Sequence, residues 1–167
     1  MYFTSYLKYA LLFLVLIVIQ VTFMSLLSLS KYNITPDLVI IMVIYMGYTR
    51  GHIAGMISGF VAGLILDVLS GSFIGLSALS YSMAGFISGY FFRQVSEGSK
   101  KRTSLIAIIF MCTLVAYSIF FIIYLQGSTV PVLEIFLNFV LTTTIYTSVF
   151  GLLFTLIFNR FDLKKTF

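Results

Sequence analysis

The sequence predicts an all-α fold, a single bundle of helices that crosses a membrane several times. Of the 167 residues, 60% are hydrophobic and only 9% are charged, whereas soluble domains carry about 25% charged residues. The apolar residues form long uncharged stretches, several of them near the roughly 20 residues that a helix needs to cross a bilayer core. These features indicate a polytopic membrane protein with one transmembrane domain over residues 1–167.

Six apolar segments are candidate membrane spans. In chain order they are residues 9–29, 36–48, 51–69, 73–92, 103–125 and 131–158. The first lacks a small-residue cleavage signature, so we expect a retained helix rather than a signal peptide. The second is short, since its length corresponds to only about 20 Å of helix. It either tilts inside the bundle or forms a hairpin with the third span that does not fully cross.

The positive charges favour six full crossings. With six spans and a cytoplasmic N-terminus, the only basic residue outside is Lys31, and the other nine of the ten Lys and Arg residues lie inside. Such a bias is the usual sign of membrane orientation, and it collapses if the second span fails to cross. We therefore expect both termini in the cytoplasm, and the second and third spans to form a tight hairpin around Gly47 to His52. The inner set is Lys8, Arg50, Arg93, Lys100, Lys101, Arg102, Arg160, Lys164 and Lys165.

The stretch ITPD at residues 34–37 is typical of a helix start. Thr35 can cap the helix, Pro36 suits its first position, and an acid such as Asp37 is stabilised at the positive end. Pro131 and Glu134 form a weaker copy at the sixth span. The ITPD pattern is complete as a structural signal and requires no further function.

The remaining polar residues do not form a catalytic constellation. There is one cysteine and one histidine, and no nucleotide-binding or metal-ligand motif. Gln20, in the middle of the first span, is expected to hydrogen-bond to another helix. The sixth span has a polar cluster, expected to do the same: Asn138, Thr142, Thr143 and Tyr146. The sequence therefore predicts neither an enzyme nor a cofactor or metal site. Because the basic residues flank spans, it also predicts no nucleic-acid partner.

Glycines recur every four residues in the third span and again in the fourth. The two rows are Gly51, Gly55, Gly59 and Gly63, then Gly85 and Gly89. Residues four apart lie on one face of a helix, and faces of small residues let membrane helices approach closely. We expect these two spans to pack through their glycines, with Gly71 and Gly75 bracketing the turn between them.

An aspartate continues the glycine register, in the stretch GLILDVLSGS at residues 63–72. Asp67 should therefore point toward packed protein, about 25 Å along the helix from Arg50 and near the outer boundary. In a structural role it would accept hydrogen bonds from Ser70, Ser72 or backbone amides and fix the turn. In a functional role it would bind a partner, cation or substrate, as intramembrane acids often do.

Several motifs in the first half of the chain resemble the MreD family of bacterial rod-shape proteins. They are Gln20, PDLVIIMV (36–43), RGHIAGMISGFVAGLILDVLSGS (50–72) and IGLSALSYSMAGFISG (74–89), which contains Tyr81. The C-terminal spans match only in hydrophobicity and length. The resemblance implies a non-enzymatic scaffold in the bacterial cytoplasmic membrane, a possible homodimer. It would bind MreC and link MreB filaments to peptidoglycan synthases.

On that resemblance, the motif residues would pack helices or contact partners, and the small-residue faces would organise the bundle and accept the MreC helix. The same glycine and D-x-x-S-G pattern is also similar to the S-components of energy-coupling-factor vitamin transporters, another family of six-helix membrane proteins. An S-component needs an outward pocket, and the outer loops offer few polar groups for one. The PDL start and the Y-x-x-x-G run favour the MreD resemblance.

Overall fold

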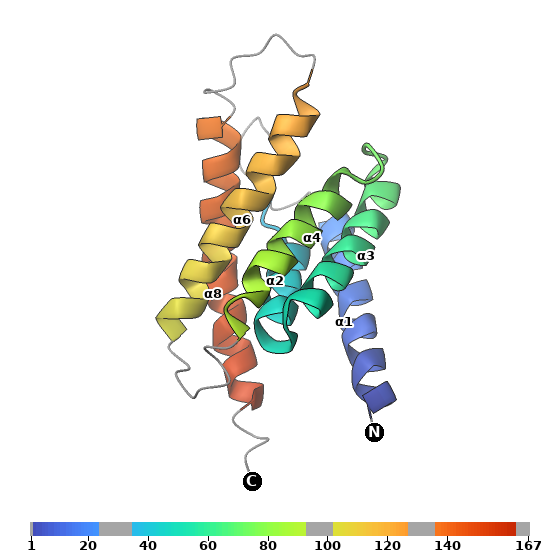
Figure 1. Cartoon of the computed structure of the whole chain (residues 1–167), viewed down its shortest axis with the longest axis vertical. Helices are drawn as coiled ribbons and strands as arrows, with labels where there is room; N and C mark the ends of the chain where they lie inside the picture. The colour runs from blue at the N-terminus through green and yellow to red at the C-terminus, as the bar shows by residue number, and fades with distance from the viewer. Residues whose placement is uncertain (1, 24–34, 93–101, 127–135, 163–167) are drawn as a thin grey trace.

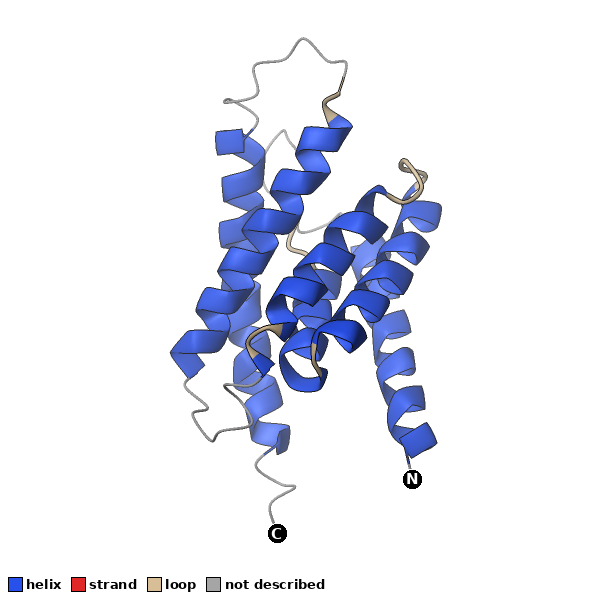
Figure 2. Ribbon diagram, viewed as in Figure 1, coloured by secondary structure: helices blue, strands red, loops and turns tan. Residues whose placement is uncertain are grey.

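The computed structural model describes residues 2–23, 35–92, 102–126 and 136–162. This part of the chain is a bundle of six helices with no strand in it (Figure 2), which confirms the expected all-α membrane fold. The helices are α1 (Tyr2–Phe23), α2 (Leu38–Arg50), α3 (His52–Ser70), α4 (Leu76–Gly89), α6 (Arg102–Tyr124) and α8 (Thr142–Asp162), and the π-helical segment η2 (Phe136–Leu141) leads into α8.

Among the described residues, three helical stretches are long and apolar enough to cross a membrane. They are His52–Ser70, Leu105–Tyr124 and Phe136–Leu153, while Leu11–Thr22 and Leu38–Arg50 are apolar but shorter. Successive helices alternate in direction, and α1 begins at the end of the bundle where α8 finishes (Figure 1). If the chain crosses a membrane an even number of times, its first helix must begin on the side where its last helix ends, as α1 and α8 do here. Two predicted features lie outside the described residues. They are the helix-start signal at Pro131 and Glu134 and the inner basic residues within 93–101.

The shortest expected span, α2, occupies the centre of the bundle. It packs against α1, α3, α4, α6 and α8, and every residue from Val39 to Ile44 is fully buried. A helix that is apolar on all sides belongs in a protein interior. Its 13 residues are therefore covered by neighbouring helices, which accounts for a length too short to match the bilayer.

The link between α2 and α3 is the single residue Gly51, so the two helices form a tight hairpin. Gly51 has a φ of +92°, a conformation that side-chain-bearing residues rarely adopt. Its amide donates to the carbonyl of Gly47 at 2.9 Å and closes the last turn of α2. Arg50 ends α2 in an exposed position, where its charge interacts favourably with the helix C-terminus.

Helices α3 and α4 pack backbone to backbone through their glycines. A Cβ added to Gly59 would lie 2.4 Å from the carbonyl oxygen of Tyr81, and one added to Gly63 would lie 2.6 Å from Cα of Ala78. Gly55 and Gly85 meet each other in the same way, at 2.2–2.4 Å. No side chain fits in these gaps, so the predicted glycine face is the contact surface of the two helices.

The same close contact extends to the other end of the α3–α4 pair and on to α2. A Cβ on Gly89 would lie 2.3 Å from the backbone of His52, where α3 begins. A Cβ on Gly47 of α2 would lie 2.4 Å from the carbonyl oxygen of Gly85. The glycines therefore join α2, α3 and α4 into one closely packed unit.

We predict that Gly59→Ala destabilises the protein by about 2 kcal/mol, because the new methyl group forces α3 and α4 apart. The loss should appear even though alanine favours a helix by about 1 kcal/mol over glycine. The free energy of unfolding in mixed detergent micelles measures it. Val61→Ala, on the exposed face of the same helix, should stay within about 0.5 kcal/mol; equal effects of the two variants would contradict the packing.

Candidate functional site

Asp37 caps the first turn of α2 from inside the protein. Its backbone is extended, with φ −104° and ψ 98°, and its Oδ1 accepts a hydrogen bond from the amide of Ile40 at 3.0 Å. The helix begins at Leu38. The expectation of Thr35 as the cap and Pro36 as the first helical residue is therefore wrong by two positions. Pro36 instead lies buried just before the cap.

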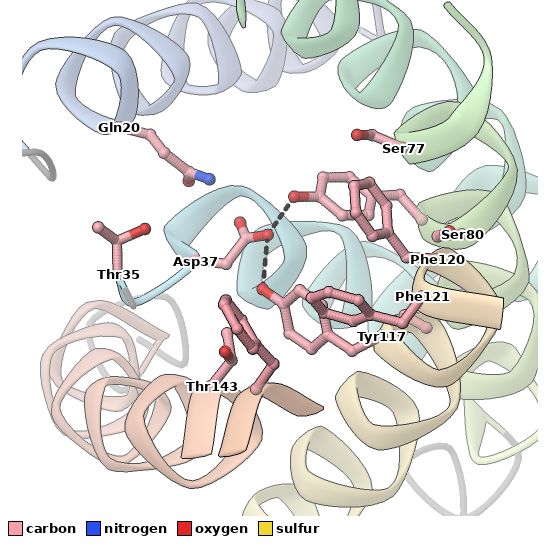
Figure 3. A pocket seen from close by; sticks show the side chains of 12 residues that line it. Gln20, Thr35, Asp37, Ser77, Ser80, Tyr117, Phe120, Phe121 and Thr143 are labelled. Atoms are coloured by element: carbon pink, nitrogen blue, oxygen red, sulfur yellow. Dashed lines mark hydrogen bonds between the residues drawn. The ribbon is translucent and has the colours of Figure 1, made fainter. Parts of the chain in front are cut away.

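The carboxylate of Asp37 is only 4% exposed and binds side chains from two other helices. Its Oδ2 accepts hydrogen bonds from the hydroxyls of Tyr81 on α4 and Tyr117 on α6, the latter at 3.0 Å (Figure 3). These charge-assisted bonds compensate for the removal of the carboxylate from water. The backbone amide of Asp37 donates to Oγ1 of Thr147 on α8 at 3.2 Å.

Gln20 completes the contacts at the start of α2. Its Oε1 accepts a hydrogen bond from the amide of Val39 at 3.0 Å, so α1 also joins this point. This confirms the expected hydrogen bond between Gln20 and another helix. Five helices, α1, α2, α4, α6 and α8, therefore meet at the buried start of α2. We call the residues that join them there the Asp37 junction: Gln20, Asp37, Tyr81, Tyr117 and Thr147.

Two members of the Asp37 junction were not found from the sequence. Tyr117 lies within a long apolar run, and Thr147 directly follows Tyr146, the last residue of the predicted cluster on the sixth span. Of that cluster, Asn138 and Thr142 are exposed, and the hydroxyl of Thr142 donates to the carbonyl of Leu137 in η2 at 3.5 Å. Only the periodicity of threonines along α8, which places buried Thr144 and Thr147 inward, could have indicated this face.

A partly open cavity of about 310 Å³ lies beside the junction. Its polar side comes from α1, the start of α2 and α4, and its aromatic side comes from α6 and η2 (Figure 3). The described lining residues are Gln20, Thr35, Asp37, Ser77, Ser80, Tyr81, Ala116, Tyr117, Phe120, Phe121, Phe139 and Thr143. This volume suits a small molecule.

Asp67 caps a second helix start, that of α4, from the end of α3. The side chain is fully buried, and Oδ2 accepts from the amides of Gly75 at 2.8 Å, Ser77 at 3.1 Å and Ala78 at 3.4 Å. Its Oδ1 accepts from the hydroxyl of Ser72 at 3.2 Å. These are the orphan amides that a helix N-terminus leaves. The observed contacts of Asp67 are therefore those expected for its structural role, in which it fixes the turn between α3 and α4.

The turn around Asp67 depends on two left-handed glycines. Gly71 ends α3 with φ +66° and Gly75 precedes α4 with φ +99°. A Cβ on either would meet nothing within 4 Å, so the requirement is conformational rather than steric. The hydroxyl of Ser70 lies 2.7 Å from the carbonyl oxygen of Leu66 and 3.1 Å from the hydroxyl of Ser72, and its one proton can be donated to either. It therefore reaches Asp67 only through Ser72.

The other candidate reactive groups are separate from both acids. Cys112 is buried in the apolar core. His52 is exposed and its ring contacts Phe86 and Tyr90 at centroid distances of 5.9 and 5.4 Å. Within the described ranges, no three His, Cys, Asp or Glu residues come together as metal ligands.

The fold and the two capped helix starts define a helical, polytopic membrane protein whose buried acids hold its helices together. The model of the family "rod shape-determining protein MreD" matches residues 2–161, and the chain belongs to this family. No curated protein and no solved structure gives a significant match. The family match includes the C-terminal helices, whose sequences had resembled the family only in hydrophobicity and length.

We predict that Asp67→Ala costs about 3 kcal/mol of unfolding free energy, because several amides at the start of α4 lose their acceptor. Asp67→Asn should lose less than half as much. Its amide oxygen can replace Oδ2, while its NH2 group can donate to Ser72. Unfolding in detergent micelles measures both variants. If Asp67→Ala keeps its stability and membrane level but loses its protein partners, Asp67 is a docking residue instead of a cap.

Proposed function

We propose that this protein is a non-enzymatic scaffold of the rod-shape complex, or elongasome, in the bacterial cytoplasmic membrane. It binds an MreC-like protein with a single membrane span. Through that protein it couples MreB filaments to the enzymes of peptidoglycan synthesis. The observation that carries the proposal is the match of the MreD family model to nearly the whole chain.

The roles of the buried acids support a structural rather than a catalytic function. Asp37 and Asp67 each accept backbone amides that begin a helix. A catalytic acid or base has to reach the proton of a substrate, and the described hydrogen bonds of Asp67 all come from its own turn and the start of α4. Substitutions of Asp67 should accordingly change the amount of folded protein rather than a reaction rate.

The outward face of α3 is the part of this helix that remains available to a partner helix. The glycine face, which the resemblance suggested for the MreC helix, is filled by α4. Large apolar residues cover the opposite face in a stripe of three- and four-residue steps. The stripe comprises Ile53, Ile57, Phe60, Val61, Leu64 and Val68, each at least 37% exposed. We therefore place partner contacts on large apolar side chains, not on the glycines.

Helix α1 begins and helix α8 ends at the same end of the bundle (Figure 1), and the basic residues favour the cytoplasm for that end. Arg50 and the α2–α3 hairpin then face the cytoplasm, as the distribution of basic residues favours. Asp37 and Asp67, at the opposite ends of α2 and α3, lie toward the outer side. The cavity beside Asp37 is then nearest to the side on which the extracytoplasmic domain of an MreC-like protein lies.

We predict that the tagged protein, extracted from its native membrane in mild detergent, co-purifies with a bitopic MreC-like protein identified by mass spectrometry. The stripe variant Phe60→Lys should reduce recovery of the partner, because a charge at a lipid-buried helix contact is costly. Met111→Lys, on the exposed face of α6, is the comparison for a general effect of an added charge. Recovery of paired ATPases with a coupling membrane subunit would instead identify a transporter S-component.

A further inference from the structure

We infer that the cavity at the Asp37 junction is a binding site for a small organic cation with an apolar body, whose ammonium group binds the Asp37 carboxylate. This inference goes beyond the scaffold function and does not depend on which protein partner binds. It rests on the shape of the cavity, on the hydrogen-bonding capacity of its walls and on their charge.

The polar wall of the cavity is organised around the carboxylate of Asp37. The hydroxyls of Tyr81 and Tyr117 both donate to it, and the side chains of Gln20 and Thr147 in turn bond to the two phenol oxygens. The hydroxyl of Ser80 donates to the carbonyl of Leu76 at 2.9 Å. The fixed side-chain donors of this wall are therefore already engaged, and what the wall offers a ligand is the acceptor capacity and the charge of Asp37.

The charge of the wall favours a cation over a neutral donor. Among the described lining residues, the one side chain with a formal charge at neutral pH is Asp37. It is 4% exposed, and a carboxylate withdrawn from water interacts more strongly with a nearby opposite charge. The two tyrosine bonds stabilise this charge without neutralising it, so an ammonium group provides the missing countercharge.

The opposite wall is aromatic and suits the apolar part of such a ligand. Phe120 and Phe121 from α6 and Phe139 from η2 line it, with ring centroids 5.6 Å apart for the first pair and 5.4 Å for Phe121 and Phe139 (Figure 3). Aromatic faces attract cations as well as apolar groups. The two walls therefore present a carboxylate and aromatic rings to one volume of about 310 Å³.

The test uses the full-length protein in nanodiscs of phosphatidylglycerol, a lipid that carries no amine. The probes are 2-phenylethylammonium and its neutral analogue 2-phenylethanol, and binding is followed by isothermal titration calorimetry and by tyrosine fluorescence. We expect saturable binding of the ammonium and at least about tenfold weaker binding of the alcohol. Equal affinities of the two probes, or no saturable binding of the ammonium at millimolar concentration, would overturn the proposal.

The variant Asp37→Asn removes the charge but retains an oxygen that can cap α2. It should weaken ammonium binding about tenfold or more and leave the alcohol unchanged. If this variant does not fold, Thr143→Leu, which narrows the cavity away from the cap, should weaken both probes. Lys31→Gln changes the charge by the same amount in the opposite direction and should not weaken the ammonium. Full affinity in both Asp37→Asn and Thr143→Leu would contradict the site.

A lipid headgroup or a free amine could supply the ammonium group. Adding phosphatidylethanolamine to the nanodiscs distinguishes them. Competition with the probe identifies a lipid as the natural ligand, while unchanged binding of the probe identifies a free amine. A failed pull-down of an MreC-like protein leaves these binding results intact, so the two proposals can fail separately.

Discussion

The structure depends on one buried helix start, that of α2. A helix N-terminus leaves its first amides without partners, and inside a membrane protein no bulk water replaces them. Asp37 and Gln20 satisfy the amides of Ile40 and Val39. The carboxylate is in turn held by hydroxyls from α4 and α6. The need to satisfy these hydrogen bonds therefore brings five helices together at the start of α2.

The start of α4 also has amides without helical partners, and there a residue of one other helix, α3, accepts their hydrogen bonds. Asp67 reaches from the last turn of α3 to three amides of α4, and the left-handed Gly71 and Gly75 bring the chain back to it. Glycines farther along then hold the two helices at backbone contact. The acid holds the outer end of the pair, the glycines hold the two helices together along their length, and α2 packs against both of them.

The elements that follow from local chemistry could be predicted from the sequence. The hairpin at Gly51, the glycine face of α3 and the inward direction of Asp67 each depend on residues close together in the chain. The cap at Asp37 was placed two residues too early, since Thr35, Pro36 and Asp37 all suit a helix start and local preferences cannot rank them. Tyr117 and Thr147 were missed because they lie 80 and 110 positions from Asp37, and only the packing of the helices brings them there. The cavity was missed for the same reason.

The central claim is that Asp37 couples α4 and α6, and a double-mutant cycle of Tyr81→Phe and Tyr117→Phe tests it most directly. Each substitution removes one hydroxyl with little change in shape, and unfolding in detergent micelles measures the stability of both single variants and of the double variant. We expect each single variant to lose about 1–2 kcal/mol and the double variant to depart from their sum by at least about 0.5 kcal/mol. Losses near zero, or strictly additive losses, would show that the two hydroxyls do not share this carboxylate in the folded protein.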